Sequence, residues 1–63
     1  MDIREIRWGM RVRDRHTKFE FVVVSFGAGI DGRDAWVYCD FEGNEGDVWE
    51  FVPEDLEDAE DRR

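Results

Sequence analysis

Residues that could do acid–base or covalent chemistry are few in this chain: it has one histidine, His16, and one cysteine, Cys39. A Cys–His pair can supply a nucleophile and its base, but His16 stands in a basic, turn-forming stretch far in sequence from Cys39. A lone cysteine in an apolar segment is typical of a small packed hydrophobe. A zinc site would need carboxylates to complete it. We therefore expect no catalytic residue, no metal, no cofactor and no enzymatic activity.

Two further patterns could bind ions but lack the residues that such sites need. Read as an EF-hand loop from Asp40, the acidic hairpin segment has Glu45 where glycine is required and Phe51 where glutamate is required. The Gly-x-Gly-x-x-Gly pattern that begins at Gly27 is followed by a predicted strand. No helix N-terminus is then present to hold a phosphate. We interpret both segments as solvated turns.

Three arginines form a candidate nucleic-acid site, because Arg7, Arg11 and Arg13 alternate with other residues along one predicted strand. Arginine pairs with phosphate bidentately. Against this reading, the chain has a net charge of −8, and a negative field repels nucleic acid while it attracts basic partners. The acids of residues 54–61 could fold back and neutralise the row, which is the interpretation we favour. A third alternative is a phage-type inhibitor that imitates the charge of nucleic acid.

Aromatic residues give the strongest functional indication, because the chain has nine of them and the interior of so small a barrel has room for only about six large side chains. Seven of these rings compete for that interior: Trp8, Phe19, Phe21, Phe26, Phe41, Trp49 and Phe51.

Trp36 and Tyr38 are then left on the surface beside Asp40 and Glu50. An exposed Trp–Tyr pair among carboxylates suits an Arg- or Lys-bearing protein or peptide. We predict a protein-binding site at Trp36, Tyr38, Asp40 and Glu50. The rings could instead cover one end of the core or join two copies in a homodimer.

Hydrophobic patterning predicts an all-β chain that positions these residues. Strands are expected at residues 6–13, 19–26, 35–41 and 47–52, with a bend at Gly9. The run 19–26 is rich in β-branched and aromatic residues and is predicted to be a strand buried on both faces. A chain this small can surround such a strand only by curling a sheet about it.

Connections between these strands follow the turn-forming residues. A loop is expected at 27–34 and a tight turn at 43–46, with Gly46 in the left-handed conformation. A turn of helix begins at Pro53, and Leu56 closes the barrel. In the hairpin we expect Cys39 opposite Phe51 and Phe41 opposite Trp49.

The order of these elements resembles that of SH3-like small barrels. The resemblance is carried by Trp8-Gly9-Met10-Arg11-Val12, the strand 19–26, the hairpin 35–52 and the closing Val-Pro-Glu-Asp-Leu of 52–56. It implies a single small SH3-like barrel of four to five antiparallel strands with a short C-terminal helical turn, as in short bacterial and phage proteins. Tudor and KOW barrels are more distant. The chain lacks the Ala-Leu-Tyr-Asp-Tyr stretch of peptide-binding SH3 domains, and no functional residue transfers from these families.

Two expectations concern domain limits and compartment. The barrel is expected to span residues 1–56, and the acidic tail 57–63 to be disordered. No apolar stretch is long enough to cross a membrane, and no charged-then-apolar leader is present. A lone cysteine suits a reducing compartment. We expect a cytoplasmic protein that does not bind membranes.

Overall fold

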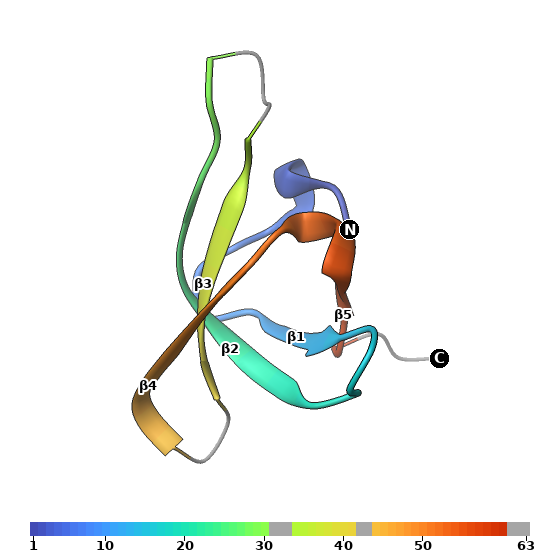
Figure 1. The fold of residues 1–63 in the computed structure, drawn as a ribbon, viewed down its shortest axis with the longest axis vertical. Coiled ribbons are helices and arrows are strands. Elements are labelled where there is room, and N and C mark those ends of the chain that lie inside the picture. The colour runs from blue at the N-terminus through green and yellow to red at the C-terminus, as the bar shows by residue number, and fades with distance from the viewer. Residues whose placement is uncertain (31–33, 42–43, 61–63) are drawn as a thin grey trace.

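Five antiparallel strands in one sheet make up the fold in the computed structural model, which describes residues 1–30, 34–41 and 44–60 (Figure 1). The strands are β1 (Arg11–Asp14), β2 (Glu20–Gly27), β3 (Trp36–Phe41), β4 (Asn44–Phe51) and β5 (Leu56–Asp58). Two single turns of 3-10 helix, η1 (Ile3–Glu5) and η2 (Pro53–Asp55), precede β1 and β5. The sheet order β4-β3-β2-β1-β5 puts β4 and β5 at the edges. This all-β arrangement confirms the predicted fold class and is compatible with a small barrel-like fold.

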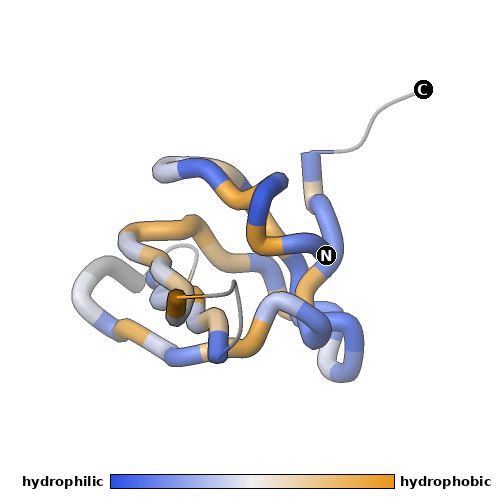
Figure 2. Tube along the Cα trace, turned by 90° about the horizontal axis from the view of Figure 1, so that it is seen from above, coloured by the Kyte–Doolittle hydropathy of each residue, from blue (hydrophilic) through white to orange (hydrophobic). Residues whose placement is uncertain are grey.

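The central strand is β2, but the prediction that it is buried on both faces is wrong, because Val24 and Ser25 are exposed and only Phe21 and Val23 are buried. It pairs with β1 through Val12 and Phe21, and with β3 through Val23 and Cys39. The longest hydrophobic stretch of the tube in Figure 2 belongs to β2. A bulge at Val24 shifts the β2–β3 register and increases the local twist.

The buried core is mainly aliphatic. Its buried hydrophobic side chains are Ile6, Val12, Phe21, Val23, Val37, Cys39 and Leu56.

Phe21 is therefore the only buried ring among the nine aromatic residues, all of which the structure describes. Of the seven rings expected to compete for the interior, Trp8, Phe19 and Trp49 are instead 76%, 52% and 44% exposed. Phe26, Phe41 and Phe51 are half-buried and pack against the core, and the rings of Phe41, Trp49 and Phe51 lie against Phe21. Trp49, for example, lies 5.6 Å from Phe21, centroid to centroid.

The N-terminal segment bends where predicted, but it contains a shorter strand than the alternation predicts. Residues 6–13 do not form one strand, because Trp8 and Gly9 make a turn and β1 begins only at Arg11. The predicted bend at Gly9 is confirmed by a φ of +78°. Gly9 N–H donates to Val23 O over 2.8 Å, so the end of the turn is hydrogen bonded to β2. The reversal carries Trp8 outward while Ile6 stays buried.

The β3–β4 hairpin has a register two residues away from the expected one. Cys39 pairs with Trp49, and Val37 with Phe51, so the predicted partners are wrong. The cause is a bulge at residues 45–47, where Gly46 has a φ of +90°. A two-residue shift leaves every side chain on its predicted face, since side chains alternate along a strand.

The segment after Leu56 was expected to be a disordered tail, but its first residues belong to the sheet. The turn at Pro53 and the burial of Leu56 are confirmed. The sheet does not end at residue 56, however, because Glu57 and Asp58 belong to β5 and pair with β1. The boundary expected at Leu56 therefore falls inside a strand whose backbone is hydrogen bonded. Residues 61–63 of the tail, 31–33 of the loop and 43 of the tight turn lie outside the described residues.

Candidate functional site

The four residues of the predicted protein-binding site lie on one face of the sheet. Trp36, Tyr38 and Asp40 alternate along β3 with the buried Val37 and Cys39, so they point away from the core.

Pairing between β3 and β4 completes the set. Glu50 of β4 is the register partner of Tyr38, and Val48 is the partner of Asp40. We call this surface of β2, β3 and β4, on the side away from the core, the outer face.

Trp36 is half-buried although no second layer of the described residues covers the outer face, because its ring lies across Gly27 of β2. Gly27 and Trp36 are register partners. A Cβ at position 27 would lie 2.8 Å from Cη2 and 2.9 Å from Cε2 of the Trp36 ring. The missing side chain of glycine therefore provides the space that the indole occupies. Tyr38 is half-buried as well, so the two rings are less exposed than the sequence led us to expect.

Three valines that the sequence analysis did not assign to a site accompany these rings. Val24, Val48 and Val52 are 43%, 52% and 46% exposed. Val48 precedes Glu50 by two residues in β4, and Val52 follows Glu50 by two residues, directly after the end of the strand, so the hairpin pattern could have identified both. Val24 is the extra residue of the bulge opposite Tyr38, and a bulge leaves no clear trace in the sequence.

Carboxylates give the outer face its charge. Asp40 is half-buried and Glu50 is exposed. None of the described residues of β2, β3 and β4 on this face is a lysine, an arginine or a histidine, whereas Arg11 and Arg13 of the adjacent β1 lie on the same side of the sheet and pair with Glu20 and Glu57. The face therefore offers rings, valine methyl groups and negative charge together.

The arginine row is largely occupied by ion pairs within the chain. Arg11 Nη2 lies 3.0 Å from Glu20 Oε1, and Arg13 Nε lies 3.1 Å from Glu57 Oε2. Glu57 belongs to the acidic segment expected to fold back, whereas Glu20 stands on β2 and was not foreseen. Arg7 has no ion-pair partner among the described residues. The structure therefore does not present the three arginines as one free cationic row.

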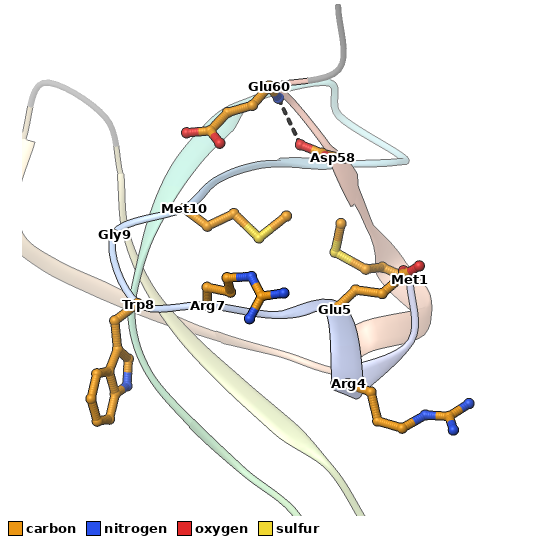
Figure 3. A pocket seen from close by; sticks show the side chains of 9 residues that line it. All are labelled: Met1, Arg4, Glu5, Arg7, Trp8, Gly9, Met10, Asp58 and Glu60. Atoms are coloured by element: carbon orange, nitrogen blue, oxygen red, sulfur yellow. Dashed lines mark hydrogen bonds between the residues drawn. The ribbon is translucent and has the colours of Figure 1, made fainter.

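Arg7 lines an open pocket of about 610 Å³ between the N-terminal segment and the end of β5 (Figure 3). Its guanidinium extends among the lining side chains, whereas the Trp8 ring points away from them. Glu5, Asp58 and Glu60 also line the pocket, and Asp58 accepts a hydrogen bond from Glu60 N over 2.8 Å. Side chains of both charge signs thus line the pocket, so its lining does not favour one class of ligand.

The two residues considered for nucleophilic chemistry are not brought together. His16 is exposed, and its Nε2 lies 3.3 Å from Asp55 Oδ1. Cys39 is fully buried and free, and desolvation, with the charge of Asp40 as a smaller cause, raises the pKa of its thiol to about 12. A thiol with so high a pKa is a poor nucleophile at neutral pH.

Within the described part of the chain, no three His, Cys, Asp or Glu residues are grouped as a metal site would need. In that same part, no helix has the length and apolar character needed to span a bilayer.

No family model, curated protein or solved structure matches this chain. The candidate site therefore depends on the geometry described above.

Proposed function

We propose that this protein is a non-enzymatic binding module with an SH3-like barrel, which recognises a basic protein or peptide through the outer face. The observation that carries the proposal is the composition of that face: Trp36 and Tyr38 lie among exposed valines, with Asp40 and Glu50 beside them. The position of the 3-10 turn η2, after the β3–β4 hairpin, supports the SH3-like assignment.

Each component of the face has a partner group on a basic ligand. Arginine or lysine over an aromatic ring contributes roughly 0.5–2 kcal/mol, depending on desolvation. The exposed methyl groups of Val48 and Val52 would lose water contact under the aliphatic stem of such a side chain. The carboxylates of Asp40 and Glu50 would speed encounter and disfavour acidic competitors.

Nucleic-acid binding has less support than protein binding. Arg11 and Arg13 each have a carboxylate within 3.1 Å, so a phosphate would have to displace an existing ion pair. Mimicry of nucleic-acid charge by the acidic residues is a further alternative that shares the prediction of a basic protein partner. We propose a cytoplasmic location for the module, in keeping with its free and buried Cys39.

A titration monitored by NMR tests the proposal. We expect lysine- and arginine-rich peptides with apolar residues between the charges to shift the indole N–H signal of Trp36 and the ring signals of Tyr38. Glu50→Lys should weaken this binding at least about tenfold, which corresponds to about 1.4 kcal/mol. The matched control is Glu54→Lys, which makes the same change in net charge on η2 at an exposed side chain.

Two results would refute the proposal. One is an absence of shifts at Trp36 and Tyr38 with every basic peptide at low salt. The other is an equal loss of affinity in both charge-reversed variants, because binding would then respond to net charge alone. Duplex DNA and single-stranded RNA in parallel titrations test the nucleic-acid alternative.

A further inference from the structure

The outer edge of β4 is a second feature of the same region. β4 is the last strand in the sheet order and pairs only with β3. In an antiparallel strand, alternate residues direct both backbone groups away from the paired neighbour. Apart from the ladder with β3, no backbone hydrogen bond within the described parts of the chain reaches Val48–Phe51.

This edge has few of the features that block the addition of a strand. Natural edge strands are commonly protected by lysine, proline, bulges or a covering segment. The β4 bulge lies at residues 45–47, before the stretch Val48–Phe51. Within that stretch the exposed apolar residues alternate, with Val48 on the outer face and Trp49 on the core side.

Trp49 has a defined position at this edge. Its ring is stacked with that of Phe51, with centroids 6.5 Å apart and an angle of 11° between the planes. It is also stacked with Phe41 at 6.4 Å. A strand added beside β4 would therefore meet a fixed ring on the core side and valine on the outer face.

Charge determines which strand suits the edge. A second copy of this chain would bring another net charge of −8 and a second Glu50 to this edge. An extended segment with lysine or arginine at alternate positions would instead direct those side chains toward Glu50 and, one strand further, Asp40. Its intervening apolar side chains would lie against Trp49.

We propose that β4 is a docking strand, to which an extended basic segment of the partner adds as a sixth strand of the sheet. This inference rests on the proposed function and specifies how the basic partner is bound. Backbone hydrogen bonds to β4 would contribute affinity, and the alternating side chains would provide specificity.

The test uses an acetylated and amidated octapeptide of alternating lysine and valine, together with two N-methylated isomers. One isomer is methylated at the lysine nitrogens and the other at the valine nitrogens. In a strand, residues of one parity direct their backbone groups to the same edge. We expect one isomer to bind like the parent and the other to bind at least about tenfold more weakly. Binding of the parent should also slow the exchange of outward-facing amide protons in Val48–Phe51.

The outcomes separate this inference from the proposed function. Shifts at Trp36 and Tyr38 with equal behaviour of the two isomers would overturn strand addition and leave recognition by the outer face standing. An absence of shifts with the parent and with every other basic peptide would overturn both. A dimer of the free protein in sedimentation, with β4 amides already protected, would identify a second copy as the occupant and overturn the choice of a basic segment.

Discussion

Replacing Gly27 by alanine should displace the Trp36 ring from the outer face. The added Cβ would lie within 3.0 Å of three atoms of the indole, a separation that real Cβ contacts essentially never show. The indole is the outer end of a side chain, so we expect it to rotate away while β2 and β3 remain paired.

The magnitude of the effect follows from what the ring loses. Overpacking a well-packed site, or turning a half-buried ring out of it, costs about 1–2 kcal/mol. A domain of this size has a free energy of unfolding of roughly 3–9 kcal/mol. At an open position with a negative φ, Gly→Ala commonly stabilises a protein by about 0.4–1 kcal/mol. The sign of the change in the free energy of unfolding on Gly27→Ala therefore distinguishes a clash with Trp36 from an open position.

A double-mutant cycle measures this coupling. Urea unfolding would be compared for the parent, Gly27→Ala, Trp36→Ala and the double variant. We expect Gly27→Ala to destabilise the parent by about 1–2 kcal/mol and to be neutral or stabilising when Trp36 is absent. In a background with Trp8→Phe and Trp49→Phe, the emission of Trp36 should shift to longer wavelength in Gly27→Ala.

Equal effects of Gly27→Ala in the presence and absence of Trp36 would refute this reasoning. The cost would then come from the backbone of β2 and not from the ring. An unchanged emission maximum of Trp36 would refute it as well, since the ring would have kept its place.

Three further predictions concern the ion pairs and the buried thiol. Arg13→Gln should lower the free energy of unfolding by less than about 1 kcal/mol, because the ion pair of Arg13 with Glu57 is only partly buried. A double-mutant cycle with Glu57→Gln measures the coupling energy of the pair, and a coupling energy above about 1 kcal/mol would contradict its description as a weak surface pair. The Asp2 carboxyl should titrate at about 2 rather than 3.8 by NMR, because the Arg4 side chain holds its pKa low, and Arg4→Gln should return the pKa toward the ordinary value. Its stabilising contribution should be present above pH 4 and lost as the pH falls toward 2. The Cys39 thiol, with its pKa raised to about 12, should resist thiol reagents until the protein unfolds. Unfolding should become easier from about pH 9 to 12, by up to about 1.4 kcal/mol per pH unit, and Cys39→Ala should lack this slope.

The sequence predicted which residues share a face of the sheet more reliably than it predicted how deeply each side chain is buried. The alternation around Tyr38 and Glu50 placed both on the outer face, and the two-residue register error in the hairpin did not change this. A bulge at residues 45–47 caused that error. A bulge depends on how two strands meet, so neither strand's pattern reveals it.

The burial of each side chain was harder to predict, because it depends on the curvature of the sheet and on which side chains pack against one another. Counting rings correctly indicated that the interior could not hold them all, but it selected the wrong ones to leave outside. Trp8 lies outside because the turn at Gly9 reverses the chain. Trp36 is half-buried because a glycine stands on the neighbouring strand, a pairing that only the β2–β3 register provides.

The outer face follows from the size of the chain as much as from its sequence. A sheet needs another layer on each apolar face, and the described residues supply one layer, on the core side. The only helical elements in the described parts of the chain are the single turns η1 and η2, too short to cover β2, β3 and β4. Trp36 and Tyr38 therefore cover part of the sheet themselves, and the exposed valines beside them remain in water. The basic side chains of a segment added beside β4 would cover part of this face, and the carboxylates of Asp40 and Glu50 would favour a segment that carries positive charge.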